Sequence, residues 1–219
     1  MSLQAVIFDM DGLLINSEPM WREAEKKVFA KVGIQLTDEM CFQTVGLRID
    51  EVVEYWYRKY PWQAGSHEEI KNEVVQKVIE LVKKGGEALP GVYETLDFFE
   101  KRKIPMAIAS ASPLVIINEV VNKLHIVTRF SVIHSAELEE FGKPHPVVYL
   151  SAARMLNVQP YECLVFEDSF NGIVAARAAR MKVIAVPEDI HYGEPHFAAA
   201  HLVLKSLTEF NEEIFNSIS

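Results

Sequence analysis

The sequence predicts an α/β fold: a doubly wound parallel sheet, with an inserted α-helical cap domain. Two observations predict the sheet, namely short and nearly continuous apolar runs and the helical patterns that lie between them. A third observation predicts the insertion. Residues 9–103 separate the first apolar run from the second, and this interval is far longer than a crossover loop requires.

Five short runs rich in strand-forming residues are expected to form the sheet. They are LQAVIF at 3–8, IPMAIA at 104–109, RFSVIH at 129–134, CLVFE at 163–167 and KVIAV at 182–186. Helical patterns lie after the insertion at 92–101, 114–124, 147–156 and 169–180. Alternation of strands and helices is typical of parallel strands joined by helical crossovers, with helices on both faces of the sheet.

The long interval after the first run has a helical pattern almost throughout. Segments 21–33, 50–60 and 68–84 each carry an apolar stripe at helical spacing. The chain returns to the sheet through KKGGEALPGV, where glycine and proline end the helices. We therefore expect a core of residues 1–16 and 88–219 and a helical cap of residues 17–87.

Composition narrows the class of protein. With 49% hydrophobic residues the chain can bury a core, and its net charge of −9 disfavours nucleic acid as a partner. No apolar run reaches the ~20 residues that cross a bilayer, and no signal peptide is apparent, so we expect no membrane contact and a cytoplasmic location. The two cysteines, Cys41 and Cys163, have no metal-site spacing and are expected to be reduced and buried.

Polar residues stand where the predicted strands end. The segments are Asp9-Met10-Asp11-Gly12, Ser110-Ala111-Ser112, Glu167-Asp168-Ser169 and a separate loop Phe141-Gly142-Lys143-Pro144. Taken singly, an Asp or Ser after a strand is commonly a turn or helix-cap residue. Taken together, acidic, hydroxyl and cationic groups would meet at one edge of the sheet, where parallel sheets bind their ligands.

The carboxylates at this edge suit a hard divalent cation. Mg²⁺ takes one or two carboxylates together with phosphate and water, and Asp9 and Asp168 are the expected ligands. Lys143 can supply a fixed positive charge for a phosphate ester. Ser110, expected at the start of a helix, can donate to another phosphoryl oxygen.

Asp9 and Asp11 are expected to have different chemical roles. Asp9 can attack phosphorus and form an aspartyl-phosphate, while Asp11 protonates the leaving alkoxide and later deprotonates water. Since side chains of an extended segment alternate, the two can share an orientation, and Met10 should point into apolar packing. Gly12 would let the backbone turn without steric cost.

At these residues the sequence resembles the haloacid dehalogenase superfamily of phosphatases, in the branch with a helical cap after the first strand. The resemblance covers essentially the whole chain, through DMDGLLINSE, AIASAS, GKP and FEDSFNG in the family's order. Within that branch DGLLINSEPMW, VGLRID, SASP and KPHPVVYL are similar to the 2-deoxyglucose-6-phosphate and hexitol-phosphate (sugar phosphate) phosphatases.

The resemblance implies a Mg²⁺ site and a phosphoryl site. The metal would be held by Asp9, the backbone carbonyl of Asp11 and Asp168, with Glu167 in or near its shell. The phosphoryl group would be bound by Ser110, Lys143 and the backbone N–H of Ala111. Many relatives have Asp where this chain has Asn16. In this chain the loop that links the core to the cap would therefore make its hydrogen bonds with an amide instead of a carboxylate.

Residues of the cap should decide the substrate, which we expect to be a small phosphorylated sugar or polyol bound by a monomer. Arg48 is similar to a cap arginine that contacts phosphate or sugar in relatives, and a solvated charge at a helix start is the alternative. Glu18 lies where the chain enters the cap over the site. Trp21 could line a sugar face, whereas Trp56 is expected to pack in the core.

The leading hypothesis is a Mg²⁺-dependent sugar phosphatase. A sugar phosphomutase of the β-phosphoglucomutase type is the nearest alternative, because a phospho-aspartate can return its phosphoryl group to another hydroxyl. In those mutases the start of the cap carries a histidine where this chain has Trp21, which disfavours that alternative. A phospho-acceptor signalling domain would lack Asp11 and a cap, and a dehalogenase would need no metal.

Overall fold

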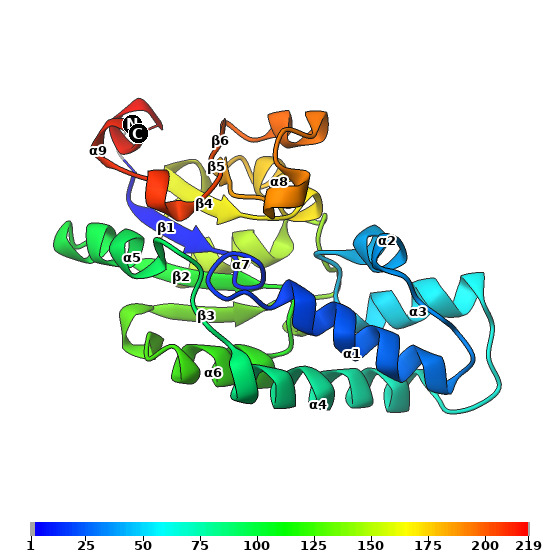
Figure 1. Ribbon diagram of the computed structural model, residues 1–219. Coiled ribbons are helices and arrows are strands. Elements are labelled where there is room, and N and C mark those ends of the chain that lie inside the picture. Colours follow the sequence, from blue (N-terminus) through cyan, green and yellow to red (C-terminus); the bar gives the residue numbers. More distant parts are fainter. Residues whose placement is uncertain (1–2, 219) are drawn as a thin grey trace.

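The computed structural model describes residues 3–218, which contain one sheet of parallel strands in the order β3-β2-β1-β4-β5-β6 (Figure 1). The strands are β1 (Ala5–Phe8), β2 (Met106–Ser110), β3 (Val132–Ser135), β4 (Cys163–Glu167), β5 (Lys182–Ala185) and β6 (Leu202–Val203). Every pairing is parallel. The predicted doubly wound sheet is confirmed, and β1 lies at its centre between β2 and β4.

Helices cover both faces of the sheet, as predicted. They are α5 (Val92–Lys101), α6 (Leu114–Lys123), α7 (Val147–Met155), α8 (Phe170–Ala178) and α9 (Glu212–Ile218). Val6 and Phe8 of β1 pack in the cluster that contains α5, α6 and α9, whereas Ala5 and Ile7 pack in the cluster that contains α7 and α8. The alternation of a buried strand therefore supplies two apolar layers from one short run.

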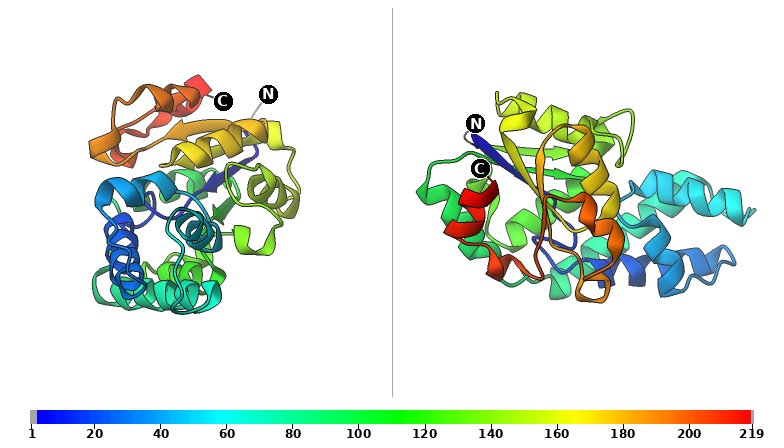
Figure 2. Two further views of the ribbon diagram at one scale, coloured as in Figure 1. Left: turned by 90° about the vertical axis from the view of Figure 1, so that its right-hand side faces the viewer. Right: turned by 90° about the horizontal axis from the view of Figure 1, so that it is seen from above.

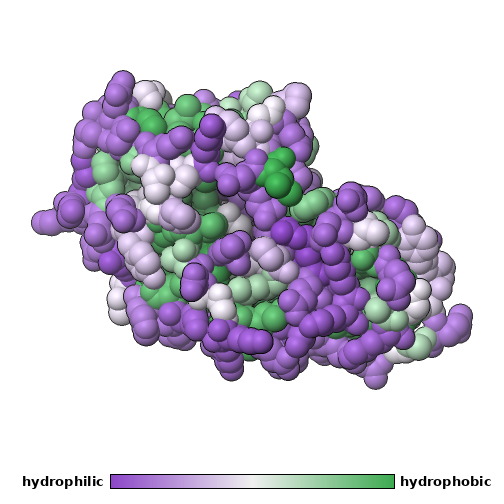
Figure 3. Space-filling view, in the orientation of Figure 1, coloured by the Kyte–Doolittle hydropathy of each residue, from purple (hydrophilic) through white to green (hydrophobic). Residues whose placement is uncertain are grey.

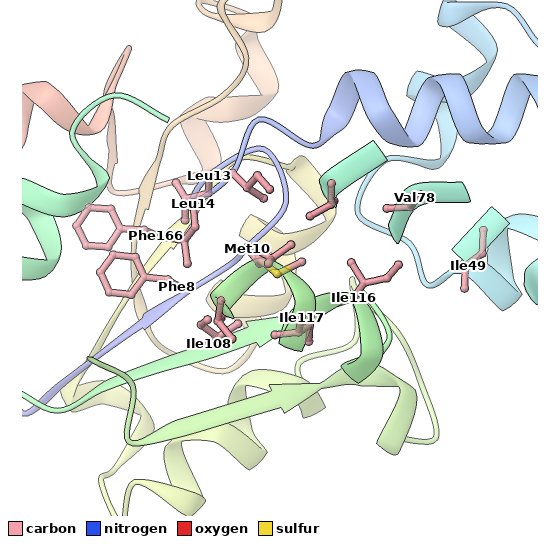
Figure 4. Close-up of a cluster of buried hydrophobic side chains, with 14 of the residues drawn as sticks. Phe8, Met10, Leu13, Leu14, Ile49, Val78, Ile108, Ile116, Ile117 and Phe166 are labelled. Carbon is pink, nitrogen blue, oxygen red and sulfur yellow. The ribbon is translucent and has the colours of Figure 1, made fainter. Parts of the chain in front are cut away.

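The apolar layer beneath α5 and α6 continues past the end of β1. Met10 is fully buried and lies near Ile108, Ile116 and Ile117 (Figure 4). The prediction that Met10 points into apolar packing is confirmed. This packing fixes the backbone on both sides of Met10, and so it fixes the positions of the two aspartates.

Three of the α-helices and β-strands were not predicted: α2 (Asp38–Cys41), β6 and α9. Each is short, so its periodicity is too brief to stand out in the sequence. The structure also corrects one expectation about Ser110, which ends β2, whereas α6 begins only at Leu114. Ser110 therefore does not start a helix.

Four α-helices lie between β1 and α5, where the cap was expected. They are α1 (Glu18–Lys31), α2, α3 (Ile49–Lys59) and α4 (His67–Gly85). Both α1 and α3 pack against α4, and the group extends away from the sheet (Figure 2). Trp56 is fully buried among these helices, as predicted. The boundaries of the cap at 17 and 87 stay a prediction.

The two segments that join these helices to the sheet lie side by side. Ile15 forms an antiparallel bridge with Ala88, and the Asn16 N–H donates to the Glu87 carbonyl oxygen at 3.1 Å. The Leu89 N–H donates to the Leu14 carbonyl oxygen at 3.4 Å. The chain therefore leaves and re-enters the sheet layer at one place.

Hydrophilic residues cover most of the face shown in Figure 3, and hydrophobic residues gather in patches over the part that contains the sheet. Within residues 3–218, no helix combines the length and the apolar character needed to span a membrane.

Candidate active site

A cavity lies between the carboxyl end of the sheet and the segment that contains α1, α2 and α3. The side chains around it leave about 610 Å³ of space between them, part of it open to solvent. The predicted site residues that line it are Asp9, Asp11, Ser110, Ala111, Lys143, Asp168 and Glu18. Residues separated by more than 150 positions in the sequence thus face one space, because β1, β2 and β4 are neighbours in the sheet.

Lys143 is the cation of this site. Its ammonium Nζ lies 2.5 Å from Asp9 Oδ1 and 2.6 Å from Glu167 Oε1, and the side chain is almost completely buried. Burial opposes its charge, but the carboxylates of Asp9 and Glu167 outweigh this and hold the pKa of Lys143 well above its usual value. Lys143 therefore remains a cation beside Asp9.

Glu167 is held by several donors and faces away from solvent. The Tyr149 hydroxyl donates to its Oε1 at 2.7 Å, and the Ser169 N–H and hydroxyl donate to its Oε2 at 2.9 and 3.0 Å. Burial would raise the pKa of Glu167, and Lys143 nevertheless lowers it. A side chain at Gly172 would overlap this carboxylate, so the residue there must be glycine. Glu167 thus positions Lys143.

Tyr149 was missed by the sequence analysis. It lies on α7, fully buried, and its ring also lies under the Lys143 ammonium, 5.0 Å from ring centroid to Nζ. In the sequence it appears only as one more apolar residue of a helical stripe. No local signal distinguishes it from a core residue.

Three acidic side chains meet beside Lys143. Asp9, Glu167 and Asp168 each offer an oxygen within 4.8 Å of the others. Burial raises the pKa of Asp9 to about 8, with Lys143 opposing and the neighbouring carboxylates adding to the effect. Burial and the charges of Glu167 and Asp9 raise the pKa of Asp168 well above its usual value. A divalent cation would relieve this repulsion, so the oxygen donors of Asp9 and Asp168 fit a hard metal ion.

Gly12 allows Asp168 to approach the loop after β1. Its φ of +67° is in the left-handed region, and a Cβ at this position would overlap the Asp168 carboxylate. The predicted turn at Gly12 is confirmed. The structure adds a second reason for glycine, because the loop and the β4 end could not otherwise come this close.

Asp11 is held by donors from both sides of the cavity. Its Oδ1 accepts from the Ser17 hydroxyl at 2.7 Å and from the Trp21 indole N–H at 2.9 Å. Its Oδ2 accepts from the hydroxyls of Ser112 at 2.7 Å and Ser110 at 3.3 Å. Ser17 was not predicted as a site residue, and Ser112 was predicted only as part of the segment 110–112, without a role of its own. The four donors fix the orientation of this carboxylate between sheet and helices.

Glu18 begins α1 and lines the cavity on the side of Asp168. Burial, followed by repulsion from Asp11 and Glu188, raises its pKa to about 8. Arg22, one turn later, places Nη1 only 3.9 Å from a Glu18 oxygen. The carboxyl group of Glu18 thus adds to the acidic character of the cavity.

Arg48 lies elsewhere. It is not among the described residues, 3–218, that line this cavity. Its Nη1 donates to the backbone oxygens of Ala136 at 3.1 Å and Glu139 at 2.7 Å, and its Nη2 donates to Asp50 at 2.8 Å. In this arrangement Arg48 joins the start of α3 to the loop after β3. Contact between Arg48 and substrate stays a prediction.

Comparison with known proteins identifies the family. The sequence profile described as haloacid dehalogenase-like hydrolase matches residues 6–186. The chain is 42% identical over 207 residues to hexitol phosphatase B of Escherichia coli O157:H7, covering 94% of this chain and 93% of the relative. It is 30% identical to a phosphorylated carbohydrates phosphatase of Thermotoga maritima, covering 98% of this chain and 97% of the relative.

A solved structure shares the arrangement of nearly all of this chain. The β-phosphoglucomutase of Clostridium difficile superposes with a TM-score of 0.87 at 27% identity, covering 98% of this chain and 96% of the other. The chain therefore belongs to the haloacid dehalogenase-like hydrolases. It is accordingly an enzyme, and its class is phosphoric monoester hydrolase.

Proposed function

We propose that this protein is a Mg²⁺-dependent phosphatase that hydrolyses small sugar or sugar-alcohol phosphates through an aspartyl-phosphate on Asp9. The observation that carries the proposal is the buried contact of 2.5 Å between Asp9 and Lys143, beside Asp11 in one cavity. The relatives named hexitol phosphatase B and phosphorylated carbohydrates phosphatase support the substrate class.

Asp9 would act as the nucleophile. One of its oxygens attacks phosphorus in line, the bond from phosphorus to the alcohol oxygen breaks, and the alcohol leaves with that bonding pair. Lys143 stabilises the charge that gathers on the phosphoryl oxygens, because its ammonium is already fixed at the site before substrate binds.

Asp11 would move the protons. In its acid form it protonates the departing alkoxide, and as carboxylate it then takes a proton from the water that attacks the aspartyl-phosphate. The bonds from Ser17, Trp21 and Ser112 hold this carboxyl group in one orientation. The group can therefore serve both steps without moving.

Asp9, Asp168 and the backbone carbonyl of Asp11 would hold the Mg²⁺. The ion would supply neutralisation of the phosphate ester's charge and of the crowded carboxylates. Glu167 contributes less directly, because both of its oxygens already accept hydrogen bonds and it orients Lys143.

A sugar phosphomutase remains the alternative, and the comparisons do not favour it over a phosphatase. Both reactions pass through the same phospho-aspartate and differ in which hydroxyl takes the phosphoryl group. In this chain Trp21 stands at the start of α1 and donates to Asp11. Incubation with β-glucose 1-phosphate decides between them: the proposal expects free phosphate, and glucose 6-phosphate would support the mutase.

The proposal includes a cytoplasmic location and a monomeric chain. The free and buried Cys41 and Cys163 are in keeping with a reducing compartment. Size-exclusion chromatography with light scattering would measure the oligomeric state, and a stable dimer would contradict this part of the proposal.

The main test is phosphate release from hexitol 6-phosphates and hexose 6-phosphates. We expect hydrolysis with Mg²⁺, its loss with a chelator, and its recovery when Mg²⁺ is returned. Asp9→Asn should abolish turnover, whereas Asp97→Asn, which alters a surface pair with Arg129, serves as the matched control. Full activity in the chelated enzyme or in Asp9→Asn would refute the mechanism.

A further inference from the structure

A buried glutamate on α1 has no part in the mechanism above. Glu25 follows Glu18 by seven residues, and together with Trp21 and Arg22 it lies on the face of α1 that lines the cavity. Seven residues at 1.5 Å each place it about 10 Å further along the helix than Glu18. Since α1 runs away from the sheet (Figure 1), Glu25 lies further from the sheet than Glu18 does.

One oxygen of Glu25 lacks a partner. The side chain is only 7% exposed, and among residues 3–218 its Oε2 finds no hydrogen-bond donor. The Cys41 thiol donates a hydrogen bond to the carboxylate. A buried carboxylate oxygen without a donor is costly, and native proteins seldom keep one without a use. The oxygen therefore calls for a donor from the cavity side.

Arg22, the cation on this face of α1, cannot provide the recognition. Arg22 donates to Glu188 through Nη1 at 3.2 Å and Nη2 at 3.3 Å, and its Nε lies 3.8 Å from Asp38. Its guanidinium is thus already paired with carboxylates. Among the described residues on this face of α1, a second anionic group on a ligand would meet no unpaired cation, and it would be repelled by Glu25.

Apolar side chains also line the cavity. Leu47, Ile49 and Val52 line it from the segment that leads into α3 and from α3 itself. A carboxylate in an apolar wall gives directional recognition of a hydroxyl, and the apolar neighbours keep water from competing.

We propose that Glu25 determines specificity: its carboxylate accepts a hydrogen bond from a hydroxyl on the alcohol part of the substrate, and so selects uncharged polyhydroxylated monophosphates over bisphosphates. This inference rests on the proposed function and deepens it. It assigns the recognition of the sugar chain to the first inserted helix, at a point distant from the reacting phosphorus.

The experiment compares wild type, Glu25→Gln and Glu25→Met on D-sorbitol 6-phosphate, p-nitrophenyl phosphate and fructose 1,6-bisphosphate. The measured quantity is the ratio of kcat/KM for sorbitol 6-phosphate to that for each other ester. Loss of one hydrogen bond to a charged acceptor should lower this ratio by about 10- to 100-fold in Glu25→Met. Glu25→Gln should fall between, because its amide oxygen still accepts.

A matched control is available on the opposite side of the same helix. Glu23 is exposed and paired with Lys27, so Glu23→Gln removes an equal charge without facing the cavity. We expect the ratio of kcat/KM values in Glu23→Gln to equal the ratio in wild type. Thermal melting and circular dichroism establish that each variant is folded.

Two failures are distinguishable. If wild type with Mg²⁺ does not hydrolyse sorbitol 6-phosphate or any other polyol or sugar phosphate, the proposed function falls, and this inference falls with it. If wild type hydrolyses sorbitol 6-phosphate but both Glu25 variants keep the ratio within about twofold, only the role of Glu25 is overturned.

Discussion

Glu25→Gln should stabilise the protein in a pH-dependent way. Burial raises the pKa of Glu25 to about 7 from the usual 4.5, although the Cys41 thiol and Arg22 oppose this. The pKa of Glu25 in the folded state thus exceeds its usual value by about 2.5, and one pKa unit corresponds to about 1.36 kcal/mol. When Glu25 is ionised in both the folded and the unfolded state, its burial therefore lowers the free energy of unfolding by ~3.4 kcal/mol. This is a large fraction of the 5–15 kcal/mol that is typical of a domain.

The sign follows from proton binding. A raised pKa means that the folded state binds the proton more tightly than the unfolded state, so the stability contributed by Glu25 is complete below pH ~4.5. It is lost as the pH rises through about 7, the pKa in the fold. Glu25→Gln cannot ionise and should escape this loss. Its free energy of unfolding, relative to wild type, should rise by about 2–3 kcal/mol between pH 5 and pH 8.

The assay is urea unfolding of both proteins at pH 5, 6, 7 and 8. Comparing the change with pH removes any pH-independent cost of the amide, because that cost is equal at every point. At pH 8 the expected gain corresponds to a rise of roughly 5–10 °C in Tm for a chain of this size. Glu23→Gln, on the exposed face of α1, should lack this gain.

A constant difference between wild type and Glu25→Gln from pH 5 to pH 8 would refute the reasoning. It would mean that the Glu25 carboxylate is as well solvated in the fold as in the unfolded chain. A variant that is more stable and less selective would indicate that the protein keeps a destabilising charge for recognition.

Further predictions concern the support of the acidic site. Gly172→Ala should displace the Glu167 carboxylate and lower kcat by about 10²-fold or more through misplacement of Lys143, measured by phosphate release; an unchanged kcat would contradict the role of Glu167. Tyr149→Phe should cost about 1–3 kcal/mol in urea unfolding, because a buried bond to a carboxylate is lost; equal stability would contradict it. Asp11→Asn should reduce kcat by about 10²-fold or more through lost acid-base help, and near-native turnover would remove it from that role.

The sequence predicted the central strands because their apolar runs are buried on both faces and hence almost uninterrupted. The run at 163–167 coincides with β4, and the others differ from β1, β2, β3 and β5 by one to three residues at one or both ends. The two-residue β6 was missed, because it lies at the edge of the sheet and carries no pattern of its own. The end of β2 at Ser110 was also missed, because strand ends are set by pairing with β3.

Asp9, Asp11, Ser110, Lys143 and Asp168 could be predicted to lie together because each ends a strand, follows one or lies in a loop beside one. The edge of a parallel sheet gathers such positions by geometry alone. Met10 likewise followed from alternation along an extended segment. The position of each residue relative to the nearest predicted strand was sufficient for all of these predictions.

Tertiary structure alone decided what each charge does. The sequence could not separate Glu167 from Asp168, yet the fold buries Glu167 against Tyr149 and leaves Asp168 facing the cavity. It could not foresee that Glu25 would have an unpaired oxygen. The physical reason is that burial and hydrogen-bond partners come from residues distant in the chain, and these determine whether a carboxylate binds, positions or recognises.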